Sequence, residues 1–150
     1  MSEDLIEHIG NCLEHIKMLP IFLEMGFNRE DFISDYSENK LTEENLKSIK
    51  RLFKSKILFQ REKYDSKAID FFIGKYFAVK ACPNLTYNYD KGLNELGRID
   101  TDLYFVLNKF MKNWDMFDYN DTDPITGGYR DILFDFVNGL TEWSKGKSVV

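Results

Sequence analysis

The chain has 150 residues, of which 43% are hydrophobic and 15% are aromatic, and it contains only three prolines. This length is typical of one domain, and so large an apolar and aromatic fraction excludes general disorder. The sequence begins without a basic stretch followed by an apolar run, and it nowhere approaches the ~18 consecutive apolar residues of a membrane helix. We therefore expect one helical domain over residues 1–150, located in the cytoplasm, with Cys12 and Cys82 as reduced thiols.

The net charge of −5 is distributed in blocks along the chain. Residues 1–46 carry a charge of −8, residues 47–67 carry +6 and residues 98–142 carry −5. Such blocks indicate either internal pairing or two differently charged faces, and internal pairing is the favoured interpretation. The basic block also raises nucleic acid as a ligand, but the sequence pI of about 5.1 argues against it.

Two helices are expected in the first third of the chain. Apolar residues recur at helical spacing from Leu5 to Ile16, which predicts an amphipathic helix over residues 3–18 that ends or kinks at Pro20. Asn28 then predicts the cap of a short helix, because aromatic residues occupy the hydrophobic-staple positions on either side of its first turn.

A basic helix is expected next. Thr42 repeats the capping signal, and an apolar stripe from Leu46 to Ile57 continues at helical spacing while the lysines lie mostly off it. This pattern predicts a helix over residues 47–67.

The middle of the chain predicts a buried helix followed by a loop. Asp65 or Ser66 can cap a segment that is apolar on nearly all sides and that Pro83 ends. A strand is the alternative for this segment, since short apolar runs do not distinguish the two. Residues 83–98 have a loop-like composition, with at most a short helical piece around residues 93–96.

Two more helices are expected at the end of the chain. Thr101 opens a helix whose apolar stripe ends at Trp114, and Asp123-Pro124 is a strong start signal for the last helix. Gly127-Gly128 can loosen the first turn of that helix. Its periodic apolar face comprises Tyr129, Ile132, Leu133, Phe136, Leu140 and Trp143. These elements predict an all-α fold, a single compact bundle of five or six helices.

One cluster has the residue types of a metal site. His8, Cys12 and His15 stand at i, i+4 and i+7, a spacing that can bring three metal ligands onto one side of a helix. If zinc were bound, Cys82 would be the natural fourth ligand. Because Cys12 leans toward the apolar stripe and both histidines flank it, we favour histidines at the core boundary over a metal.

The sequence offers little evidence for a set of catalytic residues. Both histidines of the chain lie in that cluster, so none remains elsewhere to act as a base for a nucleophile. The carboxylate pairs Asp100 with Asp102 and Asp131 with Asp135 fit caps and solvated helix faces better than an acid and a base. We expect neither an enzyme nor a cofactor.

Large rings alternate with aspartates between Asn113 and Asp123, and no Lys or Arg interrupts them. Acid mixed with aromatic suits contact with a basic partner, because carboxylates accelerate encounter and anchored rings supply binding energy. The alternative, which is commoner for aromatic stripes at helical spacing, is that Trp114 and Phe117 complete the buried face of a helix. The predicted contact residues are Trp114, Asp115, Asp118, Tyr119, Asp121 and Asp123.

Two segments carry a family resemblance. Residues 33–38, I-S-D-Y-S-E, are similar to the opening helix-cap motif of the small acidic immunity proteins that neutralise colicin-type nucleases. Residues 121–124, followed by Gly127 and by a helix that ends in Trp143 and residues 146–148, resemble the closing helix of that family. The resemblance implies a helical inhibitor of a nuclease or toxin, and it assigns no binding residues here.

The leading hypothesis is a non-catalytic acidic helical protein that binds a basic protein partner, as an immunity protein or another inhibitor of a toxin or nuclease. One alternative is a regulatory or phage- or virus-encoded module that binds an amphipathic helix in an apolar groove. Another is a nucleic-acid-binding protein that uses the 47–67 helix. A homodimer is compatible with each of these hypotheses.

Overall fold

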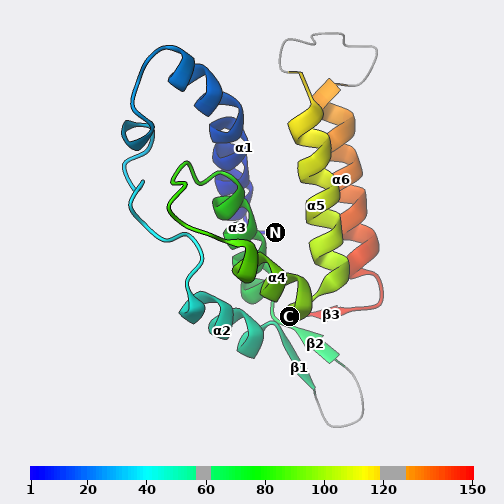
Figure 1. Ribbon diagram of the computed structural model, residues 1–150. Coiled ribbons are helices and arrows are strands. Elements are labelled where there is room, and N and C mark those ends of the chain that lie inside the picture. Colours follow the sequence, from blue (N-terminus) through cyan, green and yellow to red (C-terminus); the bar gives the residue numbers. More distant parts are fainter. Residues whose placement is uncertain (57–61, 119–127) are drawn as a thin grey trace.

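A computed structural model describes residues 1–56, 62–118 and 128–150 of the chain (Figure 1). The described part contains six α-helices, a 3-10 turn and three short strands. They are α1 (Glu3–Glu24), η1 (Arg29–Asp31), α2 (Glu43–Leu52), β1 (Lys54–Lys56), β2 (Glu62–Tyr64), α3 (Ser66–Lys80), α4 (Asp90–Ile99), α5 (Thr101–Met116), α6 (Gly128–Ser144) and β3 (Ser148–Val149). The predicted compact, predominantly helical fold is confirmed, with a small sheet in addition.

The helices form two main pairs (Figure 1). Helix α5 packs along α6, α1 packs on α3, and α2 and α4 cover one end of the molecule. Gly139 permits the close approach of α6 to α5, because a Cβ atom at this position would lie 3.0 Å from a methyl group of Val106. None of the described helices combines the length and apolar character that crossing a bilayer requires.

Helix α3 is the centre of the core. Its Phe72, Tyr76 and Phe77 side chains are completely buried, and the ring of Phe77 contacts the rings of Phe110 on α5 and Phe136 on α6. The side chain of Asp65 caps the helix by accepting from the amide of Ala68, at 2.8 Å. The prediction of a buried central helix is therefore confirmed, and the strand alternative is wrong.

Helix α1 is longer than its sequence predicts. It continues past residue 18 to Glu24, with the exposed Pro20 inside it. Beyond the proline, the ring of Phe22 stacks on Phe27 at 4.8 Å and packs edge-on against Phe32 at 5.1 Å. This aromatic packing stabilises the last turn although proline leaves one backbone hydrogen bond unmade. The predicted short helix is the single turn η1, where Asn28 makes no side-chain cap bond.

The predicted basic helix is confirmed for residues 47–52 and is wrong for residues 54–56 and 62–64, which are strands. Thr42 does cap α2, in a reciprocal capping box with Asn45, but the helix ends at Leu52. The chain then forms β1 and β2, which pair antiparallel, and β3 from the end of the sequence pairs parallel with β2. Local periodicity cannot reveal a strand whose partner lies so far along the chain, and this tertiary pairing overrides the helical pattern.

Helices α4 and α5 follow one another closely. The predicted short piece at residues 93–96 is a full helix, α4, whose Leu96 is completely buried. Gly97 is one of the residues that give this region its loop-like composition. A Cβ atom at this position would lie 3.1 Å from the ring of Tyr104, so the glycine allows α4 to pack closely against that ring. The predicted start of α5 at Thr101 is confirmed. The predicted start of the last helix at residues 123–124 lies outside the described residues.

Candidate partner-binding site

Trp114 is a core residue with little exposed surface. Its side chain is 6% exposed, and its indole N–H donates to the backbone carbonyl oxygen of Leu13, 3.3 Å away. The ring also packs against Phe110 and Phe117. The helical stripe of α5 points Trp114 inward, so the sequence alternative of a completed buried face holds for this residue. The role of Trp114 as a contact residue stays a prediction, and its burial shows that only a small part of the side chain is exposed to a partner.

The other predicted contact residues divide into two groups. Asp115 and Asp118 are exposed at the C-terminal end of α5. Tyr119, Asp121 and Asp123 lie outside the described residues. The predicted set is therefore brought together only in part, at the point where α5 ends.

The side chain of Lys17 binds the C-terminal end of α5. Its ammonium donates to the backbone carbonyl oxygens of Phe117, at 2.7 Å, and of Asp115, at 3.3 Å. It also lies 5.8 Å from the centroid of the Trp114 ring. A cation at a helix C-terminus complements the partial negative charge of the free carbonyl groups. Lys17 is thus bonded to main-chain oxygens, and these contacts leave the carboxylate of Asp115 exposed.

An apolar groove of about 620 Å³ runs between α1 and α6. We call it the α1–α6 groove. Its floor consists of side chains that are buried, namely Ile9, Leu13, Trp114 and Phe136. Its walls are exposed apolar side chains: Met1 and Ile6 on one side and Tyr129, Leu133 and Val137 on the other. Glu14 and Phe117 complete the lining. Exposed apolar surface gathered in one place is typical of a binding site.

An acidic stripe accompanies the groove along α1. Glu3, Glu7 and Glu14 are all exposed, and together with Gly10 their spacing of four, three and four residues places them on one side of the helix. Gly10 and Glu14 themselves line the groove. Within the ranges that the structure describes, none of the acids of α1 forms an ion pair. The stripe is thus available to a partner.

The charge blocks do not neutralise one another in the described residues. Asp35 pairs with Lys40 inside the first block, and Lys54 pairs with Glu62 inside the second, at 2.6 Å. In the part of the chain that the structure describes, no ion pair joins residues 1–46 to residues 47–67. Close ion pairs between the described parts of these two blocks therefore do not support the expected internal pairing, and two differently charged faces remain the alternative interpretation.

The metal-ligand types predicted on α1 surround a small pocket of about 220 Å³, and His8, Cys12, His15 and Cys82 all line it. The thiol of Cys12 lies 3.6 Å from the Nε2 atom of His8, which in turn lies 3.1 Å from the carbonyl oxygen of Gly74. Among the described residues, no group of three potential ligands has the geometry to hold a metal ion. The described residues around this pocket therefore lack the geometry of a metal site.

Burial controls the chemistry of Cys12. Removal from water raises the pKa of its thiol from 9.0 to about 11, so the group stays protonated at neutral pH. Cys82 is half-buried, with its sulfur 3.7 Å from the hydroxyl oxygen of Tyr89, and both cysteines are free thiols. A buried, protonated thiol is a poor nucleophile.

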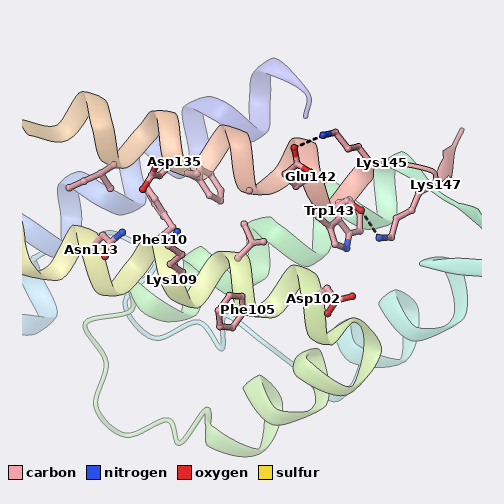
Figure 2. Close-up of a pocket in the computed structure, with 14 residues that line it drawn as sticks. Asp102, Phe105, Lys109, Phe110, Asn113, Asp135, Glu142, Trp143, Lys145 and Lys147 are labelled. Atoms are coloured by element: carbon pink, nitrogen blue, oxygen red, sulfur yellow. Dashed lines mark hydrogen bonds and ion pairs between the residues drawn. The ribbon is translucent and has the colours of Figure 1, made fainter. Parts of the chain in front are cut away.

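A second pocket, of about 430 Å³, follows the seam between α5 and α6 (Figure 2). Its lining mixes Asp102, Asp135 and Glu142 with lysines, and Glu142 pairs with Lys145 across its edge. The described lining residues include no serine, threonine, cysteine or histidine. The charged side chains along this seam are of both signs, so it is a weaker candidate for binding a charged partner than the α1–α6 groove.

The carboxylate pairs considered in the sequence have structural surroundings. Asp100 caps α5 by accepting from the amide of Leu103 at 2.8 Å, and the same oxygen accepts from the indole N–H of Trp143 at 3.0 Å. Asp102, Asp131 and Asp135 are exposed. The predicted roles of cap and solvated helix face are confirmed for these four residues.

Sequence reasoning did not identify the exposed apolar side chains that form the walls of the groove. Tyr129 and Leu133 fit the periodic buried face of α6, yet they are 54% and 37% exposed. The signal in the sequence was the width of that face, since Phe134 and Val137 extend it further than packing against α5 requires.

Comparison with protein-family models, with curated proteins and with solved structures finds no match to this chain.

Proposed function

We propose that this chain is a non-catalytic, cytoplasmic binding protein that takes up a basic protein partner and inhibits it, as an immunity protein does to a toxin or nuclease. The observation that carries this proposal is the acidic stripe Glu3, Glu7 and Glu14, exposed and without ion pairs among the described residues, beside an exposed apolar groove. The pairing of charge with apolar surface is that of a protein-binding face.

The two surfaces have complementary roles in such binding. Exposed carboxylates attract a basic surface from a distance and raise the association rate, an effect that salt screens. Apolar walls stabilise the complex after encounter, because their burial removes apolar area from water. The acidic stripe then sets how fast a partner associates, and the α1–α6 groove sets how slowly the complex dissociates.

The end of α5 extends the proposed face. Asp115 and Asp118 are exposed there, and Phe117 lines the groove. Tyr119, Asp121 and Asp123 remain predicted contact residues from the sequence. Trp114 supports this region from below through its contacts with Leu13 and Phe117.

A second candidate function is favoured by the groove itself. A regulatory or phage- or virus-encoded module would bind an amphipathic helix mainly through apolar contacts, and its affinity would depend little on salt. A basic toxin or nuclease drawn by carboxylates would bind more slowly as salt increases. Salt dependence of the association rate therefore separates the two.

The test is affinity purification from an extract of the host at low salt, with two charge-reversed variants. The first reverses Glu3, Glu7 and Glu14 to lysine, and the second makes the same change at the exposed Glu30, Glu38 and Glu44. We expect the wild type and the second variant to retain one basic protein at equimolar ratio, and the first variant to lose it. The purified partner should lose its toxic or nuclease activity when the protein is added.

Two results contradict this proposal. Retention of the same basic protein by both variants would remove the acidic stripe from the explanation. Recovery of no basic protein at low salt, with both variants folded by circular dichroism, would remove the inhibitor hypothesis.

A further inference from the structure

We propose that the α1–α6 groove receives one amphipathic α-helix of the partner, seated with its apolar face on the groove and with basic side chains along the edge that faces α1. This inference rests on the proposed function and names the element of the partner that binds. It follows from the exposure, shape and charge of the groove.

Exposure shows that the groove lacks a cover from the described part of the chain. Ile6, Tyr129 and Val137 are 56%, 54% and 51% exposed, although all three are large apolar side chains. Among the described residues, several large apolar side chains therefore lie exposed side by side, and a partner that buried them would gain free energy by removing apolar area from water.

The shape of the groove suits a helix. One wall repeats every turn of α6, at Tyr129, Leu133 and Val137, and the other follows α1. A second apolar pocket of about 260 Å³ shares Met1 and Val137 with the groove and continues it along α6 toward Leu140. The combined surface follows α6 along one side and is bordered by α1 and then by α3 on the other, an arrangement that suits an amphipathic helix whose anchoring residues lie one turn apart.

Charge selects the chemistry of the occupant. The wall on α1 carries Glu14 at its edge, with Glu3 and Glu7 on the same side of that helix. Exposed positions beside the other wall are Phe134, Thr141 and Arg130, so negative charge is concentrated along α1. A bound helix therefore needs lysine or arginine along one edge and apolar residues on the face next to it.

Binding of a second copy of this chain in the α1–α6 groove is less favourable than binding of a basic helix from a partner. A second copy of this chain would carry the same exposed acidic stripe and the same net charge of −5, so it offers no basic surface of the kind that the stripe attracts. Like charges facing one another oppose association, whereas the same carboxylates attract a basic helix. The groove is therefore assigned to a partner and not to a copy of this chain.

The probe for the test is a fluorescein-labelled Leu/Lys peptide of about 18 residues, matched in length to α6, whose leucines form one helical face. Two peptides serve as comparators: one with every lysine replaced by glutamate, and one with the Leu/Lys order scrambled. We expect saturable one-to-one binding of the first peptide by fluorescence anisotropy. Each comparator should bind at least about tenfold more weakly.

Variants locate the binding site. Val137→Glu combined with Leu133→Glu puts two charges on one wall and should weaken peptide binding by about tenfold or more. Phe105→Glu is the matched control, because Phe105 is 67% exposed but lines the seam pocket between α5 and α6. All replaced side chains are exposed, so we expect the variants to stay folded.

Several results would overturn the inference. These are equal binding of the peptide to the groove variant and the wild type, equal binding of the glutamate peptide, and a wild-type dimer that Val137→Glu dissociates. Failure of the inference can be told apart from failure of the proposed function. A natural basic partner that binds the groove variant normally, but not the variant reversed at Glu3, Glu7 and Glu14, would leave the function standing without the helix.

Discussion

The indole N–H of Trp114 donates to the carbonyl oxygen of Leu13, and this hydrogen bond joins α5 to α1 across 101 residues of sequence. Both residues belong to the floor of the α1–α6 groove. The tryptophan thus supports the proposed binding face from inside the core, and the exposed side chains above it supply the contact surface.

Replacement of Trp114 by phenylalanine should lower the free energy of unfolding by about 1 kcal/mol or somewhat more, because the ring is kept in part while the hydrogen bond is lost. Urea unfolding followed by circular dichroism measures this change. Phe105→Leu, at an exposed position of the same helix, should change stability by less than about 0.5 kcal/mol. Equal effects of the two substitutions would contradict the buried role of Trp114.

Replacement of Asp100 by alanine should cost about 2 to 3 kcal/mol of stability. The same carboxylate oxygen caps α5 at Leu103 and accepts from the indole of Trp143 on α6, so one substitution removes a helix cap and a bond between two helices. Asp102→Ala, at an exposed position two residues later, is the control and should cost far less. Thermal unfolding of both variants in the same buffer gives the comparison.

Stability should fall in alkaline solution between about pH 9 and pH 11. Burial raises the pKa of the Cys12 thiol from 9.0 to about 11, so in this range the unfolded chain releases a proton that the folded chain keeps. The free energy of unfolding then decreases as pH rises, by at most about 1.4 kcal/mol per pH unit for this group. Cys12→Ala should give a shallower slope. An identical slope in both proteins would show that Cys12 makes no contribution.

Thiol labelling should distinguish the two cysteines. At pH 8 an alkylating reagent should modify Cys82 first, because Cys12 is 5% exposed and burial keeps its thiol protonated. Peptide mapping by mass spectrometry at successive times measures the two rates. Addition of denaturant should make the rates similar, and faster labelling of Cys12 in the native protein would contradict its burial.

Much of the helical framework was predictable because its signals are local. Thr42 caps α2 through its own side chain, and Asp65 caps α3 through its own side chain. The strands at residues 54–56 and 62–64 were not predictable, because each has only three residues, β1 depends on pairing with β2, and β2 also pairs with the distant Ser148 and Val149. Such pairing leaves no periodic trace in the segment itself.

The candidate site was less predictable than the fold. Helical periodicity marks Leu133 as apolar and inward, but it cannot show whether a neighbouring helix is close enough to cover the side chain. The same periodicity correctly placed Trp114 on the buried face of α5 as the structural alternative. Charge was visible in composition, yet the absence of ion pairs between residues 1–46 and 47–67 in the described part required coordinates.

The pairing of β2 with β3 also sets an order for folding during synthesis. Ser148 and Val149 lie beside Lys63 and Tyr64, and the amide of Val150 donates to the carbonyl oxygen of Tyr64. The helices and the β1–β2 pair that precede residue 148 can form contacts while the ribosome is still extending the chain, but β3 can join the sheet only after residues 148–150 have left the exit tunnel. Until then β2 has only β1 as its neighbour in the sheet, and the backbone groups on its other edge stay in water.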